Sequence, residues 1–96
     1  MKIDIIKNGD SLTLGLNGRL DTTSAPELEA FLSSNLDGVS ALVMDCGNLS
    51  YISSAGLRVL LATQKKMQGA MKLIHVQELV MEVFEMTGFA DILVIE

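Results

Sequence analysis

Hydrophobic and polar residues alternate at the start of the chain with the period of a β-strand. Met1–Lys7 places Ile3 and Ile5 in alternation with polar side chains, and Ser11–Leu16 places Leu12, Leu14 and Leu16 on one face, as a strand with one buried face requires. Asn8-Gly9-Asp10 separates the two segments, and Asn and Gly tolerate the positive φ angles of a tight hairpin turn. We therefore expect the two segments to pair as antiparallel strands.

The next segment has the spacing of an amphipathic helix and ends at Asp37-Gly38. Ser24 and Glu27 fit the capping-box pattern at its start, and Pro26 falls in the first turn, where its missing N–H costs nothing. The apolar side chains recur every three or four residues and form one stripe: Leu28, Phe31, Leu32 and Leu36. This pattern predicts a helix that packs by one face against a sheet.

A buried strand and a second helix follow. Ala41–Met44 is a continuous apolar run, which is typical of a strand covered on both faces, and Cys46–Ile52 is expected to be a short connection. Ser53 or Ser54 then caps a helix that stops at Gly69.

The strand–helix pattern repeats once more. Met71–Val76 is expected to be a third buried strand, a third helix to run from Glu78 to Gly88, and Ile92–Ile95 to be a last strand. The third helix is expected to expose Met81 and to turn inward Leu79, Val80, Val83, Phe84 and Met86. Because strands that alternate with helices form parallel pairs, the order β-β-α-β-α-β-α-β predicts one α/β domain over residues 1–96, with a mixed, mostly parallel sheet and an N-terminal β-hairpin.

Composition narrows the class of protein. The chain has 96 residues, 49% of them hydrophobic, which suffices for one domain to bury a core. Its one cysteine excludes an internal disulfide framework and a cysteine-based zinc site. No apolar stretch of about 18 residues could span a membrane, and the early Asp4 argues against a signal peptide, so a cytoplasmic protein is expected. A net charge of −5 and only 4% aromatic residues argue against nucleic-acid binding.

Side chains for catalysis are scarce. His75, Cys46 and Tyr51 are the only residues of their types. A serine hydrolase would have to use Ser54 as nucleophile and His75 as base, and no orienting acid is evident. Neither the nucleophile-elbow pattern G-x-S-x-G nor a phosphate-binding P-loop is present. We therefore expect no enzymatic activity, no cofactor and no metal site.

A cluster of small residues lies where the second helix begins. Residues 53–56 read S-S-A-G, with Ser54 at or near the N-terminus of the helix. The first N–H groups of a helix have no partner within it, and together with the helix dipole they favour an anion there. A serine at this position is most often only a helix cap, and the spacing alone favours that interpretation.

Three motifs resemble one known family. Residues 49–60 read L-S-Y-I-S-S-A-G-L-R-V-L, which resembles the signature of anti-sigma-factor antagonists of the STAS domain family. Residues 16–21, L-N-G-R-L-D, are similar to an earlier family pattern, L-x-G-x-L-D, and residues 84–89, F-E-M-T-G-F, give a third and weaker match. The motifs occur in the family's order and spacing, and the expected element order agrees with the family's fold.

The resemblance implies a regulatory binding module. In the family, the unphosphorylated antagonist binds an anti-sigma factor that is also a serine kinase, which frees the sigma factor for transcription. The kinase then phosphorylates the antagonist at the helix start, and a phosphatase reverses the modification. Ser54 matches the phosphoacceptor. The resemblance implies a partner-binding surface of Asp21, Ser53, Ser54, Ala55, Gly56 and Arg58.

A second interpretation is a STAS subunit without a phosphorylation cycle, serving as a scaffold in a signalling assembly or with a lipid-transport ATPase. Ser53 and Ala55 stand where many family members have Asp and Ser or Thr, so both interpretations stay open. Arg58 is solvated, contacts the partner, or binds a phosphate on Ser54 one turn away. A weak homodimer is also left open.

Overall fold

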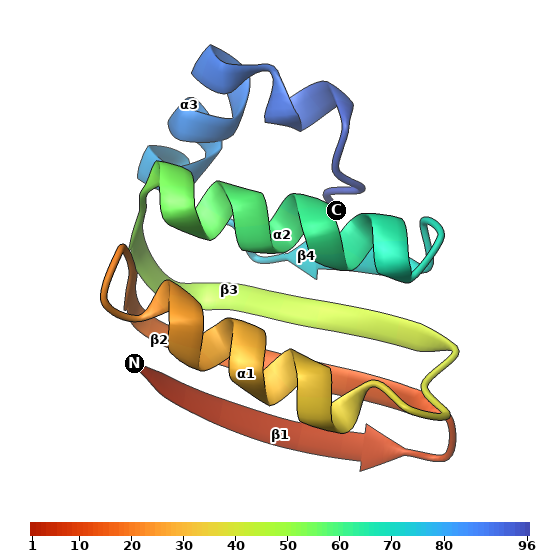
Figure 1. Ribbon diagram of the computed structural model, residues 1–96. Helices are drawn as coiled ribbons and strands as arrows, with labels where there is room; N and C mark the ends of the chain where they lie inside the picture. The colour runs from red at the N-terminus through yellow and green to blue at the C-terminus, as the bar shows by residue number, and fades with distance from the viewer.

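Four strands form one mixed sheet in the order β1-β2-β3-β4 in the computed structural model, which describes the whole chain (Figure 1). β1 (Lys2–Asn8) and β2 (Ser11–Leu20) pair antiparallel across the expected hairpin turn. β3 (Ala41–Ile52) pairs in parallel with both β2 and β4 (Met71–Ile74). The predicted α/β class, with a mostly parallel sheet and an antiparallel edge, is confirmed.

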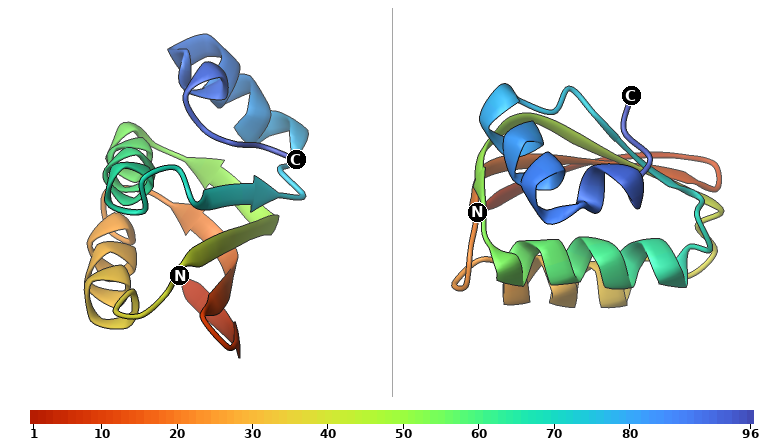
Figure 2. Two further views of the ribbon diagram at one scale, coloured as in Figure 1. Left: turned by 90° about the vertical axis from the view of Figure 1, so that its right-hand side faces the viewer. Right: turned by 90° about the horizontal axis from the view of Figure 1, so that it is seen from above.

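Two helices lie side by side on one face of the sheet. They are α1 (Ala25–Asn35) and α2 (Ser54–Lys66), while α3 (Glu78–Thr87) and the short 3₁₀ helix η1 (Phe89–Asp91) lie beyond the β4 edge (Figure 2). The longest helix has 13 residues, and none has the length and apolar character needed to cross a membrane.

The core lies between the sheet and these helices. Every second side chain is buried in it along Ser11–Leu16 of β2 and Ala41–Cys46 of β3: Leu12, Leu14, Leu16, Leu42, Met44 and Cys46. Each leucine buried in this way contributes about 1.5–3 kcal/mol. The alternate positions, such as Thr13, Val43 and Asp45, are only half-buried. The prediction that Ala41–Met44 is covered on both faces is therefore wrong, because only one face of β3 is fully buried.

Several predicted boundaries differ from the structure: β2 ends at Leu20 instead of Leu16, β4 ends at Ile74 instead of Val76, and two larger differences follow. Residues 46–52 continue β3 instead of forming a connection, because β2 also continues to Leu20 and pairs Arg19 with Tyr51 after two register shifts. The predicted last strand, Ile92–Ile95, is reduced to a single parallel bridge between Leu73 and Ile95. The residues directly before this segment, Phe89–Asp91, form the 3₁₀ helix η1. The observed order of strands and α-helices is β-β-α-β-α-β-α.

The third helix is rotated relative to the prediction. Val80 and Phe84 are fully buried, but Leu79 and Met86 are 59% and 85% exposed, and Met81 is half-buried. Because α3 lies at the sheet edge, it buries a narrow strip around Val80 and Phe84, and its opposite side faces solvent. The inward placement of Leu79 and Met86 and the exposure of Met81 were wrong predictions.

Candidate functional site

The candidate site lies at the carboxyl ends of β2 and β3, where both strands turn into helices (Figure 1). The Ser53 N–H donates to the carbonyl oxygen of Leu20 at 2.9 Å, so the turn before α2 is tied to the end of β2. Asp21 follows β2 directly and Ser54 opens α2. Two segments separated by more than thirty residues therefore share one surface, at the end of the sheet where α/β proteins commonly bind ligands and partners.

Ser54 is exposed and is the first residue of α2. Ser53 is the residue that caps the helix, with extended backbone angles, yet its hydroxyl makes no capping hydrogen bond and lies buried without a partner. The first hydrogen bond of the helix runs from the Leu57 N–H to the Ser53 carbonyl at 3.0 Å. The N–H groups of residues 54–56 therefore have no partner within the helix and point out of its N-terminal end. The Ser54 hydroxyl lies beside them and does not cap the helix.

Close packing explains why residue 56 of the S-S-A-G cluster is a glycine. A Cβ atom at this position would lie 2.7 Å from Leu20 Cγ and 2.8 Å from Ile52 Cγ1. Both neighbours belong to buried side chains. The first turn of α2 therefore packs directly on the ends of β2 and β3, which fixes the position of Ser54.

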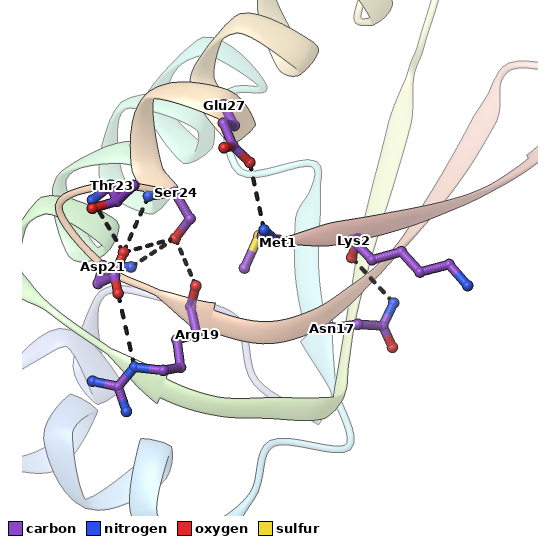
Figure 3. Close-up of polar contacts among 8 residues, drawn as sticks. All are labelled: Met1, Lys2, Asn17, Arg19, Asp21, Thr23, Ser24 and Glu27. Carbon is purple, nitrogen blue, oxygen red and sulfur yellow. Dashed lines mark hydrogen bonds and ion pairs between the residues drawn. The ribbon is translucent and has the colours of Figure 1, made fainter.

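Asp21 organises the turn that precedes α1 (Figure 3). Its Oδ1 accepts hydrogen bonds from the N–H groups of Thr23 at 3.0 Å and Ser24 at 3.1 Å. The buried Ser24 hydroxyl donates to the Arg19 carbonyl oxygen at 2.6 Å and accepts from the Asp21 N–H at 2.9 Å. The Ser24 N–H is the main cause that lowers the pKa of Asp21 below its usual 3.8, and burial opposes it.

The capping box predicted for Ser24 and Glu27 is absent, because the turn occupies the Ser24 hydroxyl. The Glu27 carboxylate lies 3.5 Å from the Met1 amino nitrogen instead (Figure 3). Asp21 thus has a structural role in the turn, and its Oδ2 remains near the surface.

Arg19 lies close to both Asp21 and Tyr51, although neither Arg19 nor Tyr51 was a predicted site residue. The Arg19 guanidinium carbon lies 4.1 Å from the centre of the Tyr51 ring, and Arg19 Nε is 3.8 Å from Asp21 Oδ2. A cation over an aromatic face is attracted by about 0.5–1 kcal/mol at exposed sites. The sequence signal was indirect, since only the register of β2 on β3 places Arg19 opposite Tyr51.

Arg58 lies one helical turn after Ser54, is exposed and makes no ion pair within the chain. It borders a groove of about 340 Å³ between the N-terminal halves of α1 and α2. The groove is lined by Thr22, Ala25, Pro26, Glu29, Ala55, Arg58 and Val59. Because Ala55 and Arg58 line this groove together with residues of α1, the start of α2 and the start of α1 form one continuous surface.

His75 does not contact Ser54. Its Nδ1 lies 3.1 Å from Asp45 Oδ1, which also accepts from the Gly47 N–H at 3.0 Å and so has a lowered pKa. The structure supplies the orienting acid that the sequence did not reveal, but no nucleophile stands beside the imidazole. The Cys46 thiol is fully buried, and this burial, with a smaller effect of the Asp45 charge, raises its pKa to about 12. No cluster of three or more potential metal ligands is present.

Sequence comparison identifies relatives along nearly the whole chain. The STAS domain family model matches residues 2–96. The chain is 41% identical over 96 residues to the "Putative anti-sigma factor antagonist BtrV" of Bordetella bronchiseptica, covering 96% of this chain and 83% of that protein. It is 30% identical over 96 residues to the anti-sigma-B factor antagonist of Bacillus subtilis, covering 97% and 88%.

Solved structures share the fold. The anti-sigma factor antagonist SpoIIAA in its unphosphorylated form has a TM-score of 0.75 and 15% identity, over 99% of this chain and 87% of that chain. The phosphorylated form from Bacillus has a TM-score of 0.74 and 16% identity, over 99% and 91%. Both sequence relatives are named as anti-sigma factor antagonists, as is SpoIIAA. With a family match over nearly its whole length and two relatives that are at least 30% identical, the chain belongs to the STAS domain family.

Proposed function

We propose that this protein is an anti-sigma-factor antagonist whose binding is controlled at Ser54. In the unphosphorylated state it binds an anti-sigma factor that is also a serine kinase, and so releases a sigma factor. Phosphorylation of Ser54 by that kinase ends the complex, and a phosphatase restores it. The observation that carries the proposal is the exposed Ser54 hydroxyl, which stands free at the first turn of α2. The antagonist relatives support the same role.

Ser54 suits a modification that changes binding without unfolding the domain. A phosphate adds about −1.5 to −2 charge and three acceptor oxygens. The outward-facing N–H groups of residues 54–56 and the helix dipole favour an anion there, by about 0.3–1 kcal/mol. Arg58, at i+4 on the same helix and without an ion pair, is available to the phosphate. The folded state therefore tolerates both forms of Ser54.

A partner interface that covers the neutral Ser54 hydroxyl does not tolerate the phosphorylated form of Ser54. Asp21 already places a carboxylate on this surface, held charged by the N–H groups of its turn. A phosphate on Ser54 would add negative charge there and would have to lose its water shell on docking. A 100-fold loss of affinity corresponds to only about 2.8 kcal/mol. The release therefore needs no refolding.

The test uses a purified kinase-type anti-sigma factor from the same organism. With ATP and Mg²⁺, the protein should gain one phosphate by intact-mass measurement, and the Ser54→Ala variant should gain none while binding like the parent. Ser54→Asp should weaken binding about 100-fold in calorimetry. Ser34→Asp, at an exposed serine of α1, is the matched charge control.

Phosphate gain at another residue, or full affinity of Ser54→Asp, would overturn the proposal. A stable complex without any phosphorylation would instead indicate the scaffold role, in which the STAS domain serves as a permanent subunit.

A further inference from the structure

The net charge of the protein is confined to its C-terminal fifth. Residues 1–77 carry seven acidic and seven basic side chains and are neutral as a group. Residues 78–96 carry five acidic side chains and no lysine or arginine, so this segment holds the whole net charge of −5. A surface with one sign of charge steers and selects partners of the opposite sign.

The same segment exposes apolar side chains on α3. Leu79 is 59% exposed and Met86 is 85% exposed, and Val83 between them is half-buried. These three residues are spaced i, i+4 and i+7, so they form one line along the helix. Val80 and Phe84, on the adjacent side of α3, are buried in the core, and Val83 packs partly against that core. The line therefore runs along the edge of the core, and its two ends, Leu79 and Met86, are left uncovered by this chain.

An acidic row runs beside the apolar line. Glu78, Glu82 and Glu85 are spaced i, i+4 and i+7 on the exposed part of α3, and none of them forms an ion pair within the chain. Like charges at this spacing destabilise a helix by about 0.2–0.5 kcal/mol per pair. Glu85 also stands in the last turn, where the helix dipole disfavours a negative charge. The row weakens the isolated helix, and a basic partner would remove this cost.

We propose that the outer face of α3 is a docking surface for a basic amphipathic helix of a partner protein. Apolar side chains of that helix pack on Leu79, Val83 and Met86, and its lysines or arginines pair with the row of Glu78, Glu82 and Glu85. A second copy of this chain would place two acidic rows against each other, and an anionic membrane would be repelled in the same way. The surface is separate from the Ser54 hydroxyl and is expected to act in both phosphorylation states.

The test uses a synthetic helical peptide with leucines at i, i+4 and i+7 and lysines on both flanks. Titrated into the isotope-labelled protein, it should shift backbone NMR signals of residues 78–87 and bind more weakly as salt is added. The double variant Leu79→Ser/Met86→Ser should lose at least tenfold in affinity, and Glu82→Gln/Glu85→Gln should lose affinity and salt dependence. Ile6→Ser, at an exposed apolar residue of β1, is the matched control and should bind like the parent.

Several results would overturn the proposal. They are signal changes located outside α3, equal binding of a peptide with glutamates in place of lysines, and unchanged affinity of the Leu79→Ser/Met86→Ser variant. Sedimentation showing a dimer that this variant abolishes would identify a second copy as the occupant, and binding of the parent to phosphatidylserine vesicles would identify a membrane. The Ser54→Asp variant should bind the peptide like the parent. If the Ser54→Asp variant alone bound the peptide with a different affinity, the α3 surface would be coupled to Ser54. The expectation that this surface acts in both phosphorylation states would then be contradicted.

Discussion

Replacing Gly56 with alanine tests whether close packing fixes the start of α2. The added methyl group would lie 2.7 Å from Leu20 Cγ, 2.8 Å from Ile52 Cγ1 and 3.0 Å from Leu20 Cδ2. Non-bonded carbon atoms prefer separations of about 3.5–4.0 Å. Leu20 and Ile52 are 0% and 2% exposed, so neither side chain can swing out into solvent. Relief therefore requires α2 to move away from the sheet, and Ser54 would move with it.

Two effects of opposite sign set the magnitude. Overpacking of this kind costs about 1–3 kcal/mol, and two buried side chains below normal contact distance place Gly56→Ala in the upper half of that range. The gain in helix propensity from glycine to alanine offsets about 1 kcal/mol. We expect a net loss of about 1–2 kcal/mol in the free energy of unfolding. For a domain of this size, each kcal/mol lowers Tm by about 4–8 °C.

Urea denaturation followed by circular dichroism measures this loss. Ser34→Ala, at an exposed position of α1, reports the propensity gain without a steric contact and should be neutral or slightly stabilising. If Gly56→Ala were as stable as the parent, the contacts with Leu20 and Ile52 would not limit the approach of α2. The glycine in the motif would then need another explanation.

Three further outcomes are expected, two at the site and one in the core. Ser54→Asp should be as stable as the parent or up to about 1 kcal/mol more stable in thermal melts, because a negative charge at a helix start is favourable; a marked loss would contradict the exposed position of Ser54. Because the folded-state pKa of Asp21 is lowered, the stability that it contributes is present above 3.8 and is lost as the pH falls through the folded value. Asp21→Asn should therefore lose less stability than the parent on acidification below 3.8 in guanidinium melts, and an equal loss would assign acid sensitivity elsewhere. Cys46 should react with an aromatic disulfide reagent only when the domain unfolds, since burial raises its pKa to about 12; rapid reaction of the native protein would refute this.

The sequence alone determined the features that depend on local spacing and turn chemistry. The Asn8-Gly9 turn predicted the hairpin, and Gly9 indeed has a φ of +64°. Alternation of strand and helix patterns predicted the mixed sheet, since right-handed crossovers leave few other arrangements. The motif at residues 49–60 placed Ser54 at the start of a helix, where the structure also has it.

Tertiary structure decided what depends on neighbours far away in the chain. β3 extends to Ile52 because β2 lies beside it, and nothing local separates a strand from a connection at residues 46–52. Ser24 stabilises the Asp21 turn instead of capping α1, because its hydroxyl donates a hydrogen bond to the Arg19 carbonyl oxygen. The exposed line on α3 was missed for the same reason. Helical spacing shows that a helix has an apolar side, but only the packing at the sheet edge decides how much of that side is covered.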